Sequence, residues 1–143
     1  MSLHKVFASA LVFASVAVAA PAQDRSPAPE DARAYIVAPE DGATVASPVT
    51  VRFGLQGMGV APAGVDNAMT GHHHLLIDVD PDTVDYSQGV PADDNHIHFG
   101  GGQTEVTLDM DPGTYTLWLL LGDANHIPHD PPVRSEPITI TVE

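Results

Sequence analysis

The chain has 143 residues, of which 43% are hydrophobic, and it carries 19 acidic against five basic residues, for a formal net charge of −14. Such a charge argues against nucleic acid and anionic membrane surfaces as partners, because both repel an acidic protein, and it favours cations. There is no cysteine, which excludes disulfides and thiolate metal ligands.

The first 22 residues have the features of a secretory signal peptide. Lys5 precedes the apolar run Val6–Ala20, and small residues stand ahead of Gln23. This order predicts a leader over residues 1–22 that is removed before Gln23. No cysteine follows for a lipid anchor, and no later apolar run is long enough to span a bilayer. We therefore expect a periplasmic or secreted protein that is not inserted in a membrane after cleavage.

Residues 23–33 are rich in Ala, Pro, Asp and Glu, a composition that predicts a disordered tether. The remaining residues, 34–143, are expected to form a single domain. Alternating or apolar runs there predict short β-strands, separated by turns rich in Gly, Pro and Asp. The expected strands cover residues 35–37, 49–55, 73–79, 96–99, 104–110, 114–121 and 138–142.

No segment after the leader shows the 3.6-residue period of a helix. About seven short strands predict an all-β protein, an antiparallel sandwich of immunoglobulin-like type. A cupin-like or other small barrel is the alternative, since periodicity does not separate the two folds. Residues expected in the core include Phe53, Ile77, Leu117, Trp118 and Leu119.

Seven of the eight histidines fall between residues 72 and 129, in three groups. His72 and His74 would point to one face of a strand, about 7 Å apart at the backbone. His96 and His98 repeat this spacing, whereas His126 lies in a loop after the most apolar strand. Imidazole is a common ligand of zinc and copper, so ligands that arrive from several elements predict a metal site.

The predicted metal ligands are His72, His74, His96, His98, His126 and His129. Further candidates are His73, Met58, Met69, Asp123 and Glu105; His73 either faces the core or joins the site. Met58 and Met69 flank the loop before the triple histidine, and thioether with imidazole suits copper. Copper is therefore the preferred ion, with zinc as the alternative.

Segments of the sequence resemble known families in two ways. Residues 38–45 (APEDGATV), and residues 111–117 (DPGTYTL), are similar to segments of bacterial immunoglobulin-like domains and of periplasmic copper-resistance carriers. Those carriers use a histidine at the mature N-terminus, where this chain offers Gln23. More specifically, three motifs resemble a family of small exported bacterial domains of unknown function. They are GHHHLLID at 71–78, HFGGGQTE at 98–105 and the segment 121–136. This resemblance spans residues 35–142 and implies export, but no activity.

The residues support three functions. The first is metal storage, delivery or tolerance. The second is a metalloenzyme, because His-x-His with a third histidine and an open position can activate a bound water. Cupins place a glutamate soon after His-x-His, but Glu105 is too far from His98 for that spacing. The third is an envelope module whose partner is another protein and whose histidines form hydrogen bonds or sense pH.

Overall fold

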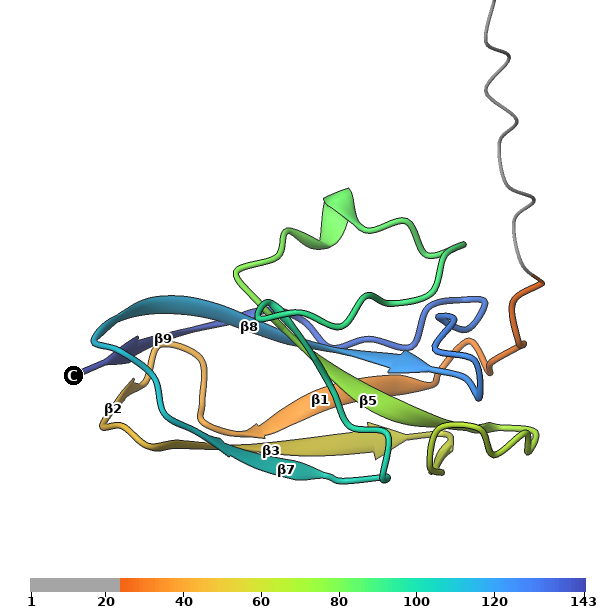
Figure 1. Cartoon of the computed structure of the whole chain (residues 1–143), viewed down its shortest axis with the longest axis horizontal. Coiled ribbons are helices and arrows are strands. Elements are labelled where there is room, and N and C mark those ends of the chain that lie inside the picture. The colour runs from red at the N-terminus through yellow and green to blue at the C-terminus, as the bar shows by residue number, and fades with distance from the viewer. Residues whose placement is uncertain (1–23) are drawn as a thin grey trace, which may run out of the picture.

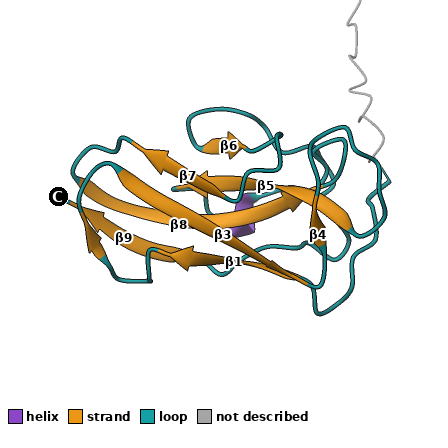
Figure 2. Cartoon of the chain, turned by 90° about the horizontal axis from the view of Figure 1, so that it is seen from below, coloured by secondary structure: helices purple, strands orange, loops and turns teal. Residues whose placement is uncertain are grey.

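The computed structural model describes residues 24–143. The expected leader, residues 1–22, lies outside the described residues. Strands make up the regular structure, apart from one short helical turn (Figure 2). The strands are β1 (Arg33–Ala38), β2 (Thr44–Val45), β3 (Val49–Gln56), β4 (Gly59–Val60), β5 (Thr70–Ile77), β6 (His96–His98), β7 (Glu105–Leu108), β8 (Gly113–Gly122) and β9 (Ile138–Val142), and the turn is η1 (Pro81–Thr83).

The strands form two sheets that pack face to face (Figure 1). The smaller sheet has the order β1-β3-β7, and both of its pairings are antiparallel. The larger sheet has the order β2-β9-β8-β5-β4, and β6 also pairs with β5. The long strands β5 and β8 lie at its centre and pair antiparallel from His72–Gly122 to Ile77–Leu117.

The predicted all-β sandwich of two sheets is confirmed. The prediction of purely antiparallel strands is wrong, because β2 pairs parallel with β9 and β4 pairs parallel with β5. These two-residue strands also raise the count from about seven to nine. The strand order does not establish immunoglobulin-like connectivity. Residues 24–143 do not form the alternative closed barrel, since their strands divide into two separate sheets.

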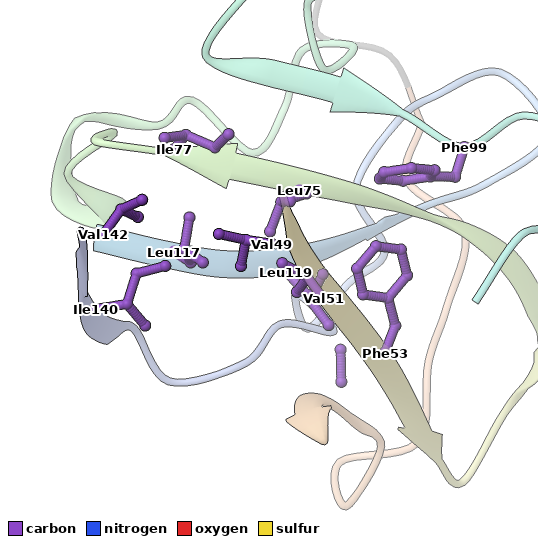
Figure 3. Close-up of a cluster of buried hydrophobic side chains, with 11 residues drawn as sticks. Val49, Val51, Phe53, Leu75, Ile77, Phe99, Leu117, Leu119, Ile140 and Val142 are labelled. Atoms are coloured by element: carbon purple, nitrogen blue, oxygen red, sulfur yellow. The ribbon is translucent and has the colours of Figure 1, made fainter. Parts of the chain in front are cut away.

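The main core fills the space between the two sheets (Figure 3). Val49, Val51 and Phe53 point inward from β3, and Leu117 and Leu119 point to meet them from β8. On β3 the buried residues alternate with exposed ones, because one face of the strand packs against the core and the other meets solvent. Burying each such side chain contributes about 1.5–3 kcal/mol.

A second, smaller cluster covers the outer face of the larger sheet. Leu76, Trp118 and Leu120 are fully buried there, beneath side chains from the loop of residues 78–95. Figure 1 shows this loop arching over β5 and β8. Both faces of β8 are therefore covered, which explains its unbroken apolar run. Trp118 was expected in the main core, but it lies on the opposite face, where its indole N–H donates to the Val79 carbonyl at 2.7 Å.

Residues 24–32 precede β1 and lie in the segment for which a disordered tether over residues 23–33 is predicted. Arg25 donates through Nε to the Pro128 carbonyl at 3.0 Å and lies 3.2 Å from the Asp130 carboxylate. Ala28 donates its backbone N–H to the Asp130 carbonyl, and Ser26 accepts from Asp130 in return. These contacts attach the segment to the loop that follows β8.

Candidate metal centre

Strand β5 places two histidines together on the outer face of the larger sheet. Side chains of a strand alternate between faces, so His72 and His74 share one face and His73 takes the other. The ring centroids of His72 and His74 lie 4.8 Å apart. His73 faces the core, where its ring lies 5.3 Å from that of Phe53. This arrangement agrees with the predicted alternation and places His73 away from the other two.

Strand β6 brings a third histidine to the same place. It pairs with β5 in the register that sets His98 opposite His74. The His98 ring centroid lies 5.2 Å from that of His74 and 4.9 Å from that of His72. A short strand thus adds a third histidine from a segment more than 20 residues further along the chain.

The loop after β8 supplies the fourth histidine. Asp123 organises this loop, because its Oδ1 accepts from the backbone N–H groups of Asn125 at 2.8 Å and Ile127 at 3.1 Å. His126 takes a left-handed conformation with a φ of 66°, which is uncommon for a residue other than glycine. Its Nδ1 lies 3.0 Å from Nε2 of His72, and its ring centroid lies 4.6 Å from that of His98.

The structure thus gathers four imidazoles from three elements. One nitrogen of each of His72, His74, His98 and His126 lies within 4.8 Å of the others. Metal–nitrogen bonds of about 2.0–2.1 Å place tetrahedral ligand atoms roughly 3.4 Å apart. The four nitrogens are spread over up to 4.8 Å, so the rings would have to move closer together to bind one ion. This cluster is called the four-histidine cluster below.

Two glycines make room for the rings of this cluster. A Cβ on Gly122 would lie 2.7 Å from Cε1 of His74 and 3.2 Å from the His126 backbone. A Cβ on Gly100 would overlap the His98 ring. Neither glycine was predicted from the sequence, although each follows or faces a histidine-bearing strand. Gly122 lies opposite His72 only through the pairing of β5 with β8, whereas Gly100 follows His98 by two residues in the sequence.

The cluster is buried on one side and open on the other. His72 and His74 are 0% and 1% exposed, whereas His98 is exposed at the surface. Burial, together with repulsion from neighbouring imidazoles, lowers the pKa of His72 to about 4 and that of His74 to about 3, from 6.5. Burial and the nearby His126 also lower the pKa of His98. These three rings are therefore neutral at pH 7, the form that binds metal.

Three buried ring nitrogens of the cluster have no hydrogen bond within residues 24–143. Nδ1 of His72 and both nitrogens of His74 have no hydrogen-bond partner in the described part of the chain. The Leu120 backbone raises the pKa of His74, against the larger lowering by burial. Buried polar atoms are almost always paired in native proteins. A metal ion at the cluster would take one nitrogen of each ring, so it would give a partner to one of the two nitrogens of His74.

Two predicted ligands lie outside the cluster. His96 pairs with Leu76 rather than His74, and its Nδ1 lies 2.7 Å from the Asp93 carboxylate. His129 is buried, with Nε2 3.1 Å from the Thr70 carbonyl. The group of converging ligands formed by residues 24–143 includes neither.

The remaining candidates have other positions. Glu105 lies on the smaller sheet, 3.4 Å from Arg52. Asp123 holds the loop, and its Oδ2 accepts a hydrogen bond from the Ser26 hydroxyl at 2.8 Å. Its negative charge raises the pKa of His72, whereas burial and the neighbouring histidines lower it. Met69 is 45% exposed and lines a separate cavity beside His129. Met58 is half-buried in the turn between β3 and β4.

The fold and site define an all-β sandwich with a partly buried cluster of four histidines that could hold a metal ion. Residues 51–143 match the family described as a domain of unknown function (DUF4399), and the chain belongs to this family. The matched region contains the whole four-histidine cluster. No curated protein and no solved structure matches the chain. Among residues 24–143, no helix has the length and apolar character needed to span a membrane.

Proposed function

We propose that this protein binds a divalent metal ion, copper in preference to zinc, through His72, His74, His98 and His126. The observation that carries the proposal is the convergence of these four nitrogens within 4.8 Å. The protein would store or deliver the ion, or protect against its excess. Its work would take place in the periplasm or outside the cell, as the predicted leader over residues 1–22 implies.

The chemistry of the cluster supports Cu(II) or Zn(II). Imidazole nitrogen suits both ions, and the general order of affinity favours Cu(II) over Zn(II). Four neutral imidazoles leave the charge of the ion uncompensated at the ligands. The formal net charge of −14 lowers the cost of that charge and attracts cations from solution. The case for copper therefore rests on affinity order and no longer on the thioethers of Met58 and Met69.

Surface exposure of His98 suits an ion that is exchanged. A ligand at the surface allows an ion to enter and leave without opening the core, whereas His72 and His74 hold it from below. The same opening would let water reach the ion, which supports a metalloenzyme as the second candidate function. A panel of hydrolase and oxidase substrates on the metal-loaded protein separates the two, since a carrier is inert.

The test is metal titration of untagged protein, purified from cells that express the full chain and stripped with a chelator. Cu(II) and Zn(II) are titrated separately, and the double variant His72→Ala/His74→Ala is compared with His129→Ala. One tight equivalent that only the double variant loses supports the proposal. Binding weaker than about 10 μM for both ions, or binding that the double variant retains, would contradict it.

A further inference from the structure

A cavity of about 330 Å³ lies beside the four-histidine cluster, between the outer face of the larger sheet and the loop of residues 78–95. Leu76 contributes from β5, and Val79, Val84 and Val90 contribute from the loop. Leu76 and His74 are i and i+2 on one strand face, so the cavity begins one step along β5 from the cluster. Its volume lies at the lower end of the range for small-molecule sites.

His96 gives this apolar cavity a defined hydrogen-bonding group. Its Nδ1 lies 2.7 Å from Oδ1 of Asp93, an exposed carboxylate. Since an ionised carboxylate only accepts, Nδ1 carries the proton in the neutral ring. In that neutral form Nε2 is the acceptor of the ring, and His96 is among the residues that line the cavity. His96 was predicted as a metal ligand, and the structure gives it this different environment.

The charge around the cavity selects against anions. Asp85 lines the cavity itself, and the loop around it carries further carboxylates at Asp80, Asp82, Asp93 and Asp94. A carboxylate ligand would be repelled by these groups and would offer no proton to Nε2 of His96. A hydroxyl group is not repelled because it is uncharged, and its O–H can donate a hydrogen bond to Nε2 of His96.

We propose that this cavity binds a small uncharged organic molecule with an apolar body and a hydroxyl group, whose O–H donates to Nε2 of His96. The apolar body occupies the space between Leu76 and the valines of the loop, and the hydroxyl lies at His96. The site is separate from the proposed metal centre and does not depend on it.

Trp118 provides the readout. It is the one tryptophan of the chain, and it packs in the same buried cluster as Leu76, with Val79, Val84 and Val90 around it. The metal-free full chain is titrated with cyclohexylmethanol while Trp118 emission is followed, and calorimetry provides an independent measurement. We expect saturable binding with a Kd of about 1 mM or tighter. Cyclohexanecarboxylate, with the same ring but a negative charge, should bind at least about tenfold more weakly.

Substitutions that fill the cavity test whether the ligand binds there. Val90→Phe and Val84→Phe each fill the cavity and should weaken binding at least about tenfold, whereas Val37→Phe, an exposed valine of the smaller sheet, should leave it unchanged. His96→Leu should weaken binding roughly fivefold, the loss of one hydrogen bond. Using two filling variants guards against one that fails to fold. Absence of saturable binding by both methods, or binding that neither filling variant weakens, would overturn the proposal.

Discussion

His74 and His98 lie directly opposite each other in the pairing of β5 with β6, with ring centroids 5.2 Å apart. The same register sets His96 opposite Leu76. Two histidines of one three-residue strand therefore have different surroundings. His98 belongs to the four-histidine cluster, and His96 belongs to the apolar cavity and its Asp93 contact.

This difference gives a matched pair of variants. His98→Ala removes one of four ligands and should lower the affinity for Cu(II) or Zn(II) at least about a hundredfold, because loss of an outer contact alone costs up to that much. His96→Ala, on the same strand, should change affinity by less than about threefold. Competition with a colorimetric chelator measures both. Equal losses for the two variants would place the ion elsewhere.

Gly122→Ala tests the space beside His74. The added Cβ would lie 2.7 Å from the His74 ring and close to the His126 backbone, so one of the two must move. We expect metal affinity to fall about tenfold or more while the fold persists, since misplaced ligands bind poorly. Gly59→Ala is the control, because a Cβ there meets only ordinary contacts at 3.7 Å. Unchanged affinity in Gly122→Ala would show that the ring positions do not matter.

His73 should make the metal-free protein sensitive to acid. Burial lowers its pKa to about 4 from 6.5, so the unfolded chain binds the proton more readily than the folded one. The contribution of neutral His73 to folding stability is therefore present above pH 6.5 and is lost as the pH falls toward 4. Between about pH 8 and about pH 5 the loss from His73 is about 2 kcal/mol. Urea unfolding of wild-type and His73→Leu protein at both values measures it; parallel pH dependence in the two would contradict this account.

Arg25 should position the loop that carries His126. It contacts the Pro128 and His129 carbonyls and pairs with Asp130. Arg25→Ala should destabilise the fold by about 1–2 kcal/mol and weaken metal binding severalfold through a more mobile loop. Hydrogen exchange of residues 123–130 should increase. Arg33→Ala, at the exposed start of β1, is the control and should show neither effect.

The faces of individual strands could be predicted from the sequence, whereas the pairing between strands could not. Alternation in β5 correctly separates His73 from His72 and His74. The choice between His96 and His98 depends on the register of β6 against β5, and a shift of two residues would exchange their places with no change in faces. The predicted position of Trp118 was wrong for a related reason. Both faces of β8 are covered, so its apolar run carries no alternation that would tell one face from the other.

The two shortest strands, β2 and β4, were also missed. Each has two residues and pairs parallel, β2 with the distant strand β9 and β4 with the following strand β5. Two residues give no measurable period, and their pairing depends on where the chain has been brought by longer strands. The contacts of Arg25 and Ser26 could not be predicted either, because the sequence does not show which loop they contact.

The central claim is that one ion is held by His72, His74, His98 and His126. Crystals of the protein loaded with one equivalent of Cu(II), measured at the copper absorption edge, locate the ion directly by anomalous scattering. The account predicts a single strong peak within about 2.0–2.3 Å of a nitrogen from each of the four rings. A peak at His96 or His129 in place of the four-histidine cluster, or no peak from protein that bound copper in solution, would contradict it.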